Sequence, residues 1–358
     1  MKYPQKVLQL LACAWLMAAP AAGETLLVVL KTGNAIEFVD PGSSLRLASV
    51  PLGFAPHEVS VAPDGRRAAV TNYGSRDRPG STVSIVDLEH PRELRRIDLS
   101  PYTRPHGVAW FAPDRIAVTA EGSRRLLLLE PESGRVIAAL ETDQEISHMV
   151  AVSADGSRAY VTSIGSGTAT AFDLTTGRKL ADIATGEGSE ALALTPDGRE
   201  LWVAARAAGH IAVVDTQSLE VKVRLPLAGI PIRVAVTPDG RTALVTCAGS
   251  SELVAYDVAA RAERKRRKVD VPLAPGATER PFAQLAPGSV LPIGLRLSRD
   301  GRSAYVAATM GDRVVQFDVA TLEPLRTIAA GGEPDGLDLT AILPRATCHA
   351  CTVDDKPE

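Results

Sequence analysis

Apolar and polar residues alternate in short segments along most of the chain, and tight turns separate the segments. The stretch that begins at Glu190, EALALTPDGRELWVAARAAGHIAVVDTQSLEVKVRLPL, contains four such segments in succession. A period of two residues predicts β-strands. The Pro-Asp-Gly turn at 196–198 favours a hairpin because glycine accepts a positive φ. We therefore expect four consecutive antiparallel strands in this unit.

The same unit recurs along the chain. Asp-Gly pairs mark the first turn of each repeat at 64–65, 155–156, 197–198, 239–240 and 300–301, with a variant at Pro113-Asp114-Arg115. The turns at 155, 197 and 239 are 42 residues apart, which is the period of a four-stranded propeller blade. Each third strand ends at an acidic residue, which we expect to shape the turn that follows. These residues are Asp40, Asp87, Glu130, Asp173, Asp215, Asp257 and Asp318.

The count of first strands predicts the number of blades and how the ring closes. Seven first strands are present, but the last, EPDGLDLTAIL, has no followers. The N-terminal segment TLLVVLKTGNAIEFVD has later strands of a blade but no first strand. We expect the two ends to share a blade, because closing a ring removes open sheet edges. The sequence thus predicts an all-β, seven-bladed β-propeller in one domain over residues 24–343.

Four segments after the turns carry a resemblance to a known family: AAVTNYGS (68–75), AYVTS (159–163), ALVTC (243–247) and AYVAA (304–308). They resemble the YVTN-repeat β-propellers. VTNYGS after PHEVSVAPDG is also similar to the lactonase-type seven-bladed propellers. The resemblance implies a periplasmic or secreted propeller. It leaves the function open, because propellers host binding, lyase, lactonase and redox roles.

The N-terminal 23 residues have the pattern of a cleaved signal peptide. Lys2 and Lys6 precede an apolar run over 7–19, and small residues allow cleavage near Ala22 or Gly23. The run is too short for a transmembrane span. A lipoprotein modified at Cys13 fits less well, because the apolar run continues past that residue. We expect a periplasmic or secreted protein.

The C-terminal tail, residues 344–358, contains a Cys-x-x-Cys pair. In an oxidising compartment Cys348 and Cys351 are expected to form a local disulfide rather than a metal or redox site. The order CHAC places His349 inside the pair and therefore does not fit a c-type haem site, which needs Cys-x-x-Cys-His. Cys247 is expected to be a small buried residue.

Charge and composition restrict the classes of partner. The chain has a formal net charge of −3, which removal of the signal peptide makes more negative, so no overall basic field favours nucleic acid. The basic stretch RAERKRRK (261–268) falls on an outer fourth strand, where alternating charges are typical of a solvated edge. A monomer is expected.

The residue that enters each first strand forms a column of unusual composition. Strand one is innermost in a propeller, so these seven side chains should surround one mouth of the central channel. Seven random positions in a chain with six histidines among 358 residues would hold about 0.1 histidine. The column holds three histidines on consecutive blades, and its two isoleucines belong to neighbouring blades. Its members are His57, His106, His148, Glu190, Ile232, Ile293 and Asp335.

This column predicts a site at the channel mouth, for which two chemistries stay open. Three imidazoles and a carboxylate suit Zn, Cu or Fe, with His57, His106, His148 and Glu190 as the candidate metal ligands. Without metal, the same histidines are candidate catalytic bases, and Arg233 can hold a carbonyl or carboxylate. The ligand-binding set we expect is His57, Glu58, His106, His148, Glu190, Asp335 and Arg280. The alternative is a water-filled channel with ordinary polar walls.

Two repeats exceed 42 residues, and propeller topology places their extra residues over the same mouth. The additions lie in NYGSRDRPGSTV, LSPYTRPH and APGATERPFAQLAPGSV (274–290). Long loops of this kind are often functional. Side chains expected to line or cover the pocket are Tyr73, Arg76, Tyr102, Arg280 and Phe282.

Three functions are consistent with these features. The first is an exported propeller that binds a small molecule or metal ion at its channel mouth. The second is a lactonase-like hydrolase or lyase that uses the same histidines, without a Ser-His-Asp order to support a covalent mechanism. The third is a platform for another periplasmic protein.

Overall fold

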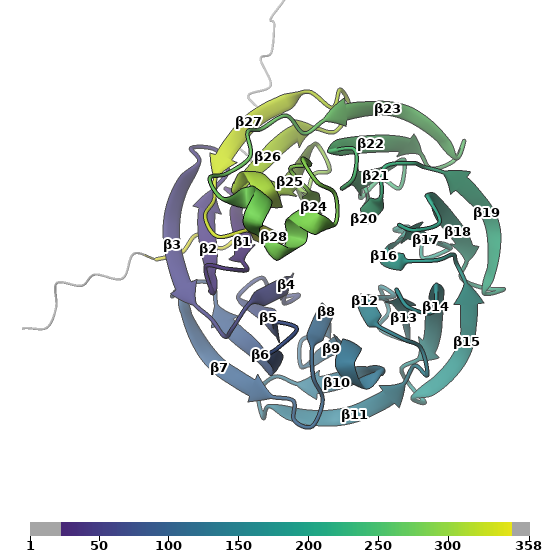
Figure 1. Ribbon diagram of the computed structural model, residues 1–358. Coiled ribbons are helices and arrows are strands. Elements are labelled where there is room, and N and C mark those ends of the chain that lie inside the picture. Colours follow the sequence, from purple (N-terminus) through teal and green to yellow (C-terminus); the bar gives the residue numbers. More distant parts are fainter. Residues whose placement is uncertain (1–22, 346–358) are drawn as a thin grey trace, which may run out of the picture.

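Each repeat folds into one four-stranded antiparallel sheet in the computed structural model, which describes residues 23–345. Seven sheets stand around a central channel as the blades of a propeller (Figure 1). The predicted fold class is confirmed.

The blades are numbered here in ring order, and their strands are given from the channel outward. Blade 1 is β28 (Pro334–Thr340), β1 (Thr25–Leu30), β2 (Ala35–Asp40) and β3 (Leu45–Pro51). Blade 2 is β4 (Pro56–Val61), β5 (Arg67–Gly74), β6 (Pro79–Asp87) and β7 (Arg92–Asp98). Blade 3 is β8 (Pro105–Ala112), β9 (Arg115–Ala120), β10 (Arg125–Glu130) and β11 (Arg135–Glu141). Blade 4 is β12 (Ser147–Val152), β13 (Arg158–Ser163), β14 (Thr168–Asp173) and β15 (Arg178–Ala184).

The remaining blades follow the same order. Blade 5 is β16 (Ser189–Leu194), β17 (Glu200–Ala205), β18 (His210–Asp215) and β19 (Glu220–Pro226). Blade 6 is β20 (Pro231–Val236), β21 (Thr242–Cys247), β22 (Glu252–Asp257) and β23 (Ala262–Lys268). Blade 7 is β24 (Pro292–Leu297), β25 (Ser303–Ala308), β26 (Arg313–Asp318) and β27 (Pro324–Ala329). Four 3-10 turns accompany them: η1 (Glu121–Ser123), η2 (Ala277–Glu279), η3 (Pro281–Gln284) and η4 (Thr309–Gly311).

Blade 1 closes the ring with strands from both ends of the chain. The C-terminal strand β28 pairs antiparallel with β1, and Leu26 lies opposite Leu339. The strand from the C-terminus supplies the innermost position, and the three N-terminal strands supply the rest. This pairing confirms the predicted closure and leaves the ring without an open edge at the junction.

The core lies between neighbouring blades and thins toward the rim. Strand β21 is buried along its whole length, whereas β23 at the rim of the same blade is almost entirely exposed. The basic stretch over 261–268 is therefore on the outer edge, as predicted. Cys247 is fully buried at the end of β21, and it is a free thiol whose pKa burial raises to about 12.

In blades 2, 3, 4 and 6 the threonine of the Val-Thr pattern joins the blade to the next one. The hydroxyl of Thr119 accepts a hydrogen bond from the Gly107 amide at 2.8 Å and donates one to the carbonyl of His148 at 2.5 Å. Thr162 donates to the carbonyl of Glu190 at 2.6 Å in the same way. These buried hydroxyls hold the backbone of the strands that enter the channel mouth, so the repeat pattern itself positions the site.

Replacing Thr119 with valine, which has nearly the same shape, is expected to lower the free energy of unfolding by about 1–3 kcal/mol, because it leaves a buried amide and a buried carbonyl unpaired. Chemical denaturation followed by circular dichroism measures the change. Thr327→Val on the exposed face of β27 is the matched control. Equal losses in the two variants would show that the hydroxyl bridge contributes nothing.

Both chain ends lie outside the described residues. The predicted signal peptide occupies most of the N-terminal part that is not described, and the predicted Cys348–Cys351 disulfide belongs to the part after residue 345. Within residues 23–345, no helix is long and apolar enough to cross a membrane.

Candidate functional site

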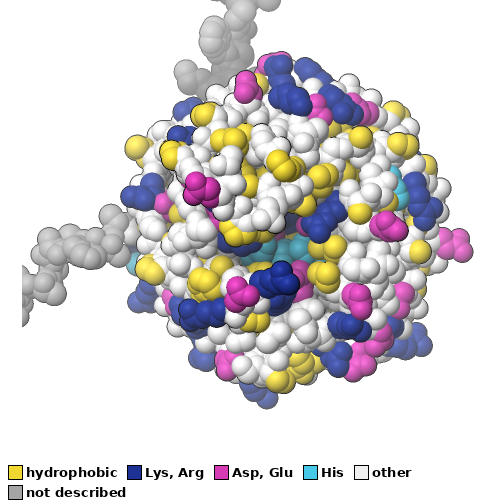
Figure 2. Space-filling model, in the orientation of Figure 1, with side chains coloured by type: hydrophobic (Ala, Val, Ile, Leu, Met, Phe, Trp, Pro, Cys, Tyr) yellow, Lys and Arg dark blue, Asp and Glu magenta, His cyan; other side chains and the backbone are white. Residues whose placement is uncertain are grey.

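The residues of the predicted column open the seven innermost strands and are all buried around one mouth of the channel. Figure 2 shows histidine side chains at the bottom of a central hollow on this face, next to basic and apolar side chains. His57, His106 and His148 come from β4, β8 and β12 of three consecutive blades. Their rings lie side by side, edge to face for His57 and His106 with centroids 4.2 Å apart, and tilted for His106 and His148 with centroids 3.6 Å apart.

A second ring of side chains lies above the first, and sequence reasoning missed it as a ring. Its members lie three residues after a valine of the second strand, near the point where that strand ends. Together with the first ring they line a cavity of about 210 Å³. The five members that line the cavity are Lys31, Tyr73, Glu121, Ile164 and Arg206.

The cavity has a polar floor that crosses the channel. Arg233, next to Ile232 on β20, reaches across to β4, where its Nη2 lies 2.6 Å from Glu58 Oε1. Its Nη1 lies 3.1 Å from the sulfur of Met149 on β12. Glu58 was predicted only as one member of the ligand-binding set. The structure places it in this buried ion pair with Arg233.

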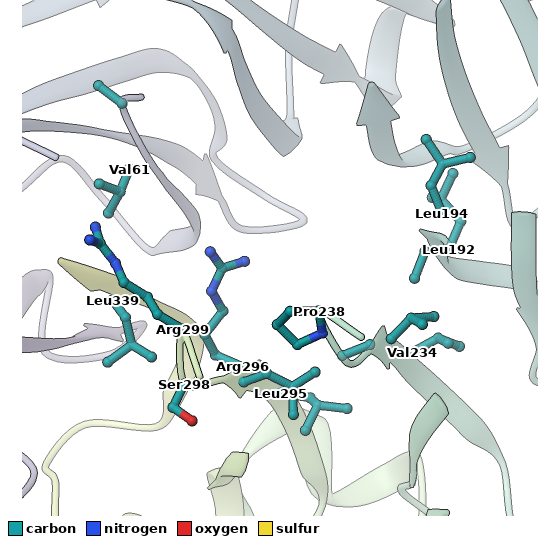
Figure 3. Close-up of a pocket in the computed structure, with 15 residues that line it drawn as sticks. Val61, Leu192, Leu194, Val234, Pro238, Leu295, Arg296, Ser298, Arg299 and Leu339 are labelled. Atoms are coloured by element: carbon teal, nitrogen blue, oxygen red, sulfur yellow. The ribbon is translucent and has the colours of Figure 1, made fainter. Parts of the chain in front are cut away.

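The opposite mouth of the channel has a different character. A cavity of about 480 Å³ there is lined by apolar ends of the innermost strands, and Figure 3 shows Leu192 and Leu194 facing Arg296 and Arg299 across it. Arg296 pairs with Asp338 at 2.8 Å. No histidine or carboxylate is among the described residues that line this cavity.

His148 is held between two carboxylates. Its Nδ1 lies 2.5 Å from Glu121 Oε1 and its Nε2 lies 3.0 Å from Glu190 Oε1. Burial by itself would lower the pKa of His148, but Glu190 and Glu121 outweigh burial and raise this pKa to about 9. His148 is therefore an imidazolium at neutral pH, with both ring nitrogens engaged.

The two carboxylates around His148 are themselves anchored. The Tyr73 hydroxyl donates to Glu121 Oε2 at 2.6 Å, and Arg206 Nη1 lies 2.7 Å from Glu190 Oε2. Burial and the Glu121 charge raise the pKa of Tyr73, so this phenol stays protonated. The result is a fixed ionic network on one side of the cavity.

His57 and His106 form the other side and differ from His148 in their partners. His57 Nδ1 lies 2.5 Å from Asp335 Oδ2 of β28. Burial opposes ionisation of Asp335, but its contact with His57 and the nearby Lys31 outweigh burial and lower the pKa of this carboxyl. His106 is 2 % exposed, and its Nδ1 has no partner among the described residues.

His106 is a neutral imidazole. Burial, reinforced by the neighbouring His148 and His57, holds the pKa of His106 well below its usual value. Three histidines that occupy one register position therefore have three different roles: a charged His148, a neutral His106, and a His57 backed by a carboxylate.

Potential metal-ligating atoms form two overlapping groups among the described residues. Atoms of His57, Glu58 and His106 lie within 4.8 Å of one another, and so do atoms of His106, Glu121 and His148. Glu190 was predicted to ligate a metal ion together with the three histidines. It belongs to neither group. Its carboxylate is engaged by His148 and Arg206.

The loop additions contribute unequally to this face. The segment with η2 and η3 lies over the channel mouth beside β24 and β28 (Figure 1), and its Phe282 and Leu285 line the cavity. Arg280 does not line it, because its guanidinium is paired with Asp312, with two contacts of 2.7 Å. Tyr102 packs instead against the core between blades 2 and 3.

Comparisons with known proteins address the fold and family. A family model described as YNCE-like beta-propeller matches residues 116–278. No functionally curated protein matches the sequence. Among solved structures, the hydrazine synthase of Kuenenia stuttgartiensis is similar at 18% identity and a TM-score of 0.67, covering 84% of this chain and 93% of that one.

A functionally unknown protein from Desulfotomaculum acetoxidans is similar at 14% identity and a TM-score of 0.72, covering 88% of this chain and 98% of that one. At these identities the two solved structures support the fold alone. The repeats, the seven closed blades and the family match agree with one another and fit a YVTN-type seven-bladed β-propeller family.

Proposed function

We propose that this protein is an exported binding propeller whose channel mouth holds a divalent transition-metal ion through His57, His106 and Glu58. The observation that carries the proposal is the convergence of two imidazoles and a carboxylate, all buried, with ligand atoms within 4.8 Å of one another. Nitrogen and carboxylate ligands in this combination suit Zn²⁺, Cu²⁺ or Fe²⁺. Export rests on the signal-peptide pattern of the first 23 residues.

The protonation states favour this triad over the one that contains His148. A metal ligand must offer a free lone pair, and the His148 imidazolium has both nitrogens engaged by carboxylates. His106 is neutral and has an unpartnered ring nitrogen. His57 contacts Asp335 through Nδ1, which leaves Nε2 for a metal. A carboxylate behind a ligating histidine is the usual outer-shell arrangement of metal sites.

Glu58 completes the set with one of its two oxygens. Arg233 contacts Oε1, so Oε2 remains for a ligand. Arg233 approaches this carboxylate from blade 6, His106 comes from blade 3, and His57 precedes Glu58 on its own strand. The ion pair with Arg233 fixes the orientation of the carboxylate before any ligand arrives. Preorganisation of this kind reduces the ordering cost of binding.

The test is metal content per chain. The protein tested carries Cys348→Ser and Cys351→Ser, because these substitutions remove the thiolates of the tail as alternative zinc ligands. It is loaded with Zn²⁺, dialysed, and assayed for metal by mass spectrometry. We expect about one equivalent of zinc. His57→Gln and His106→Gln are each expected to lower the affinity at least tenfold.

His90→Gln is the matched control, because His90 is an exposed histidine on the rim of blade 2. The proposal would be overturned if the His57→Gln/His106→Gln double variant retained as much zinc as His90→Gln. Absence of retained zinc in the parent protein would do so as well.

A further inference from the structure

A second, larger cavity adjoins the histidine cavity on the same face. It has a volume of about 740 Å³, within the range of small-molecule sites. Lys31, Tyr73 and Phe282 line both cavities and therefore mark their junction. A molecule in the outer cavity would thus lie directly against the wall of the inner one.

The Lys31 amine lies at this junction without a carboxylate partner in residues 23–345. Among the described residues, no carboxylate oxygen lies within ion-pair distance of its Nζ, although Asp335, Glu333 and Glu121 act on it from further away. Its Nζ is 3.6 Å from the centre of the Phe282 ring. Burial lowers the pKa of Lys31 against the pull of these carboxylates. Lys31 is partly buried, and a charge withdrawn from water is costly unless it is paired, so an anion bound here would stabilise its ammonium form.

The rest of the outer cavity combines positive charge with aromatic walls. Arg76 and Arg104 line it, and Arg104 is fixed by a hydrogen bond from its Nη2 to the Arg76 carbonyl. Phe54, Tyr73 and Phe282 supply ring surfaces. Rings of this kind pack well against a flat apolar ligand.

Two acidic residues also line the cavity and would oppose an anion. Asp77 is exposed, so solvent and salt screen its charge. Glu333 is buried, and burial raises the pKa of its carboxyl. Arg76 is exposed as well, so its charge is screened in the same way. Lys31 and Arg104 are partly buried and face Glu333, whose ionisation is opposed by burial, which leaves the cavity favourable to a negative ligand.

We propose that the outer cavity binds an aromatic carboxylate, whose carboxyl group pairs with Lys31 at the junction and whose ring packs between Phe54, Tyr73 and Phe282. The carboxylate then lies next to His57, and the ring points toward solvent between Arg76 and Arg104. This inference goes beyond metal binding and does not require it, because Lys31 belongs to neither metal-ligating group.

Isothermal titration calorimetry on chelator-treated protein tests the proposal, with benzoate and phenylacetate as probes. Benzamide and benzyl alcohol are the uncharged analogues, and acetate is the charge without a ring. We expect the aromatic acids to bind at least tenfold more tightly than any of these three. Lys31→Met is expected to weaken them at least tenfold, and Lys31→Arg to retain most of the affinity.

Lys265→Met, at an exposed lysine on the rim strand β23, is the matched control and is expected to change nothing. Thermal melts of the Lys31 variants separate lost binding from lost folding. Equal affinity for benzoate and benzamide, unchanged affinity in a folded Lys31→Met protein, or no binding of either acid at millimolar concentration would each overturn the proposal. Because His106→Gln should lose metal while keeping acid binding, since His106 does not line the outer cavity, failure of one proposal is distinguishable from failure of the other.

Discussion

Replacing Glu58 with glutamine is expected to lower the free energy of unfolding by about 3 kcal/mol, because it leaves Arg233 buried without its direct counter-ion. Arg233 is 9 % exposed and Glu58 is 7 % exposed, so water cannot replace the lost carboxylate. The loss should fall at the low end of the usual range for a broken buried pair, since Asp335 and Glu190 also act on Arg233. Chemical denaturation of chelator-treated protein measures the change.

The exposed pair of Arg124 and Glu145 provides the control. Both side chains are more than half exposed, so Glu145→Gln should cost less than about 1 kcal/mol. The double variant Glu58→Leu/Arg233→Met replaces the pair with apolar side chains and should recover most of the stability lost in Glu58→Gln. If Glu58→Gln cost no more than Glu145→Gln, the channel floor would not depend on this ion pair.

The parts of the structure that repeat were predictable from sequence. A blade needs four alternating segments and three turns, so the 42-residue period and the Asp-Gly turns specify the strands and their number. Register then follows, because a shift by one residue would turn the buried face of a strand outward. That is why the column of His57, His106 and His148 could be assigned to one mouth of the channel before any coordinates.

The second ring has no such common residue type. Lys31, Tyr73, Glu121 and Arg206 occupy one register position, yet they differ in charge, size and shape. The signal that could have found them is positional: each lies three residues after a valine near the end of a second strand. Their importance comes from convergence on one cavity, which only the closed ring produces.

Protonation states were beyond the sequence for a related reason. His106 and His148 are equivalent in register, but His148 lies between Glu121 and Glu190 whereas His106 has imidazole neighbours. Non-periodic insertions were equally hard to place. Phe282 and Arg280 are two residues apart in one loop, but Phe282 faces the cavity and Arg280 pairs with Asp312.

The stability of the protein should fall as the pH rises from about 6.5 to about 9, and His148 should account for about 3 kcal/mol of that fall. The pKa of His148 is about 9 in the folded protein and close to 6.5 in an unfolded chain. The folded state therefore retains a proton that the unfolded state releases in this interval. The stabilisation is complete below pH 6.5 and disappears as the pH passes through 9.

The groups around His148 determine how this dependence is measured. Glu121 and Glu190 have lowered pKa values and stay ionised throughout the interval, so they do not contribute to it. Lys31 acts in the opposite direction. Its pKa is lowered in the folded protein, so the unfolded chain binds this proton more tightly, and the effect of Lys31 is to raise stability as the pH increases toward the ordinary pKa of lysine. The contribution of His148 is therefore the difference between parent protein and His148→Gln, each unfolded by denaturant at a series of pH values without metal.

His148→Gln should be less stable at pH 6.5, and its stability should depend much less on pH, so the two curves should converge toward pH 9. His90→Gln at the exposed rim is the matched control and should follow the parent protein. Parallel curves for the parent and His148→Gln would mean that His148 is not an imidazolium held by two carboxylates. Its lone pair would then be free, and the triad of His106, Glu121 and His148 would compete with the triad of His57, His106 and Glu58 for a metal ion.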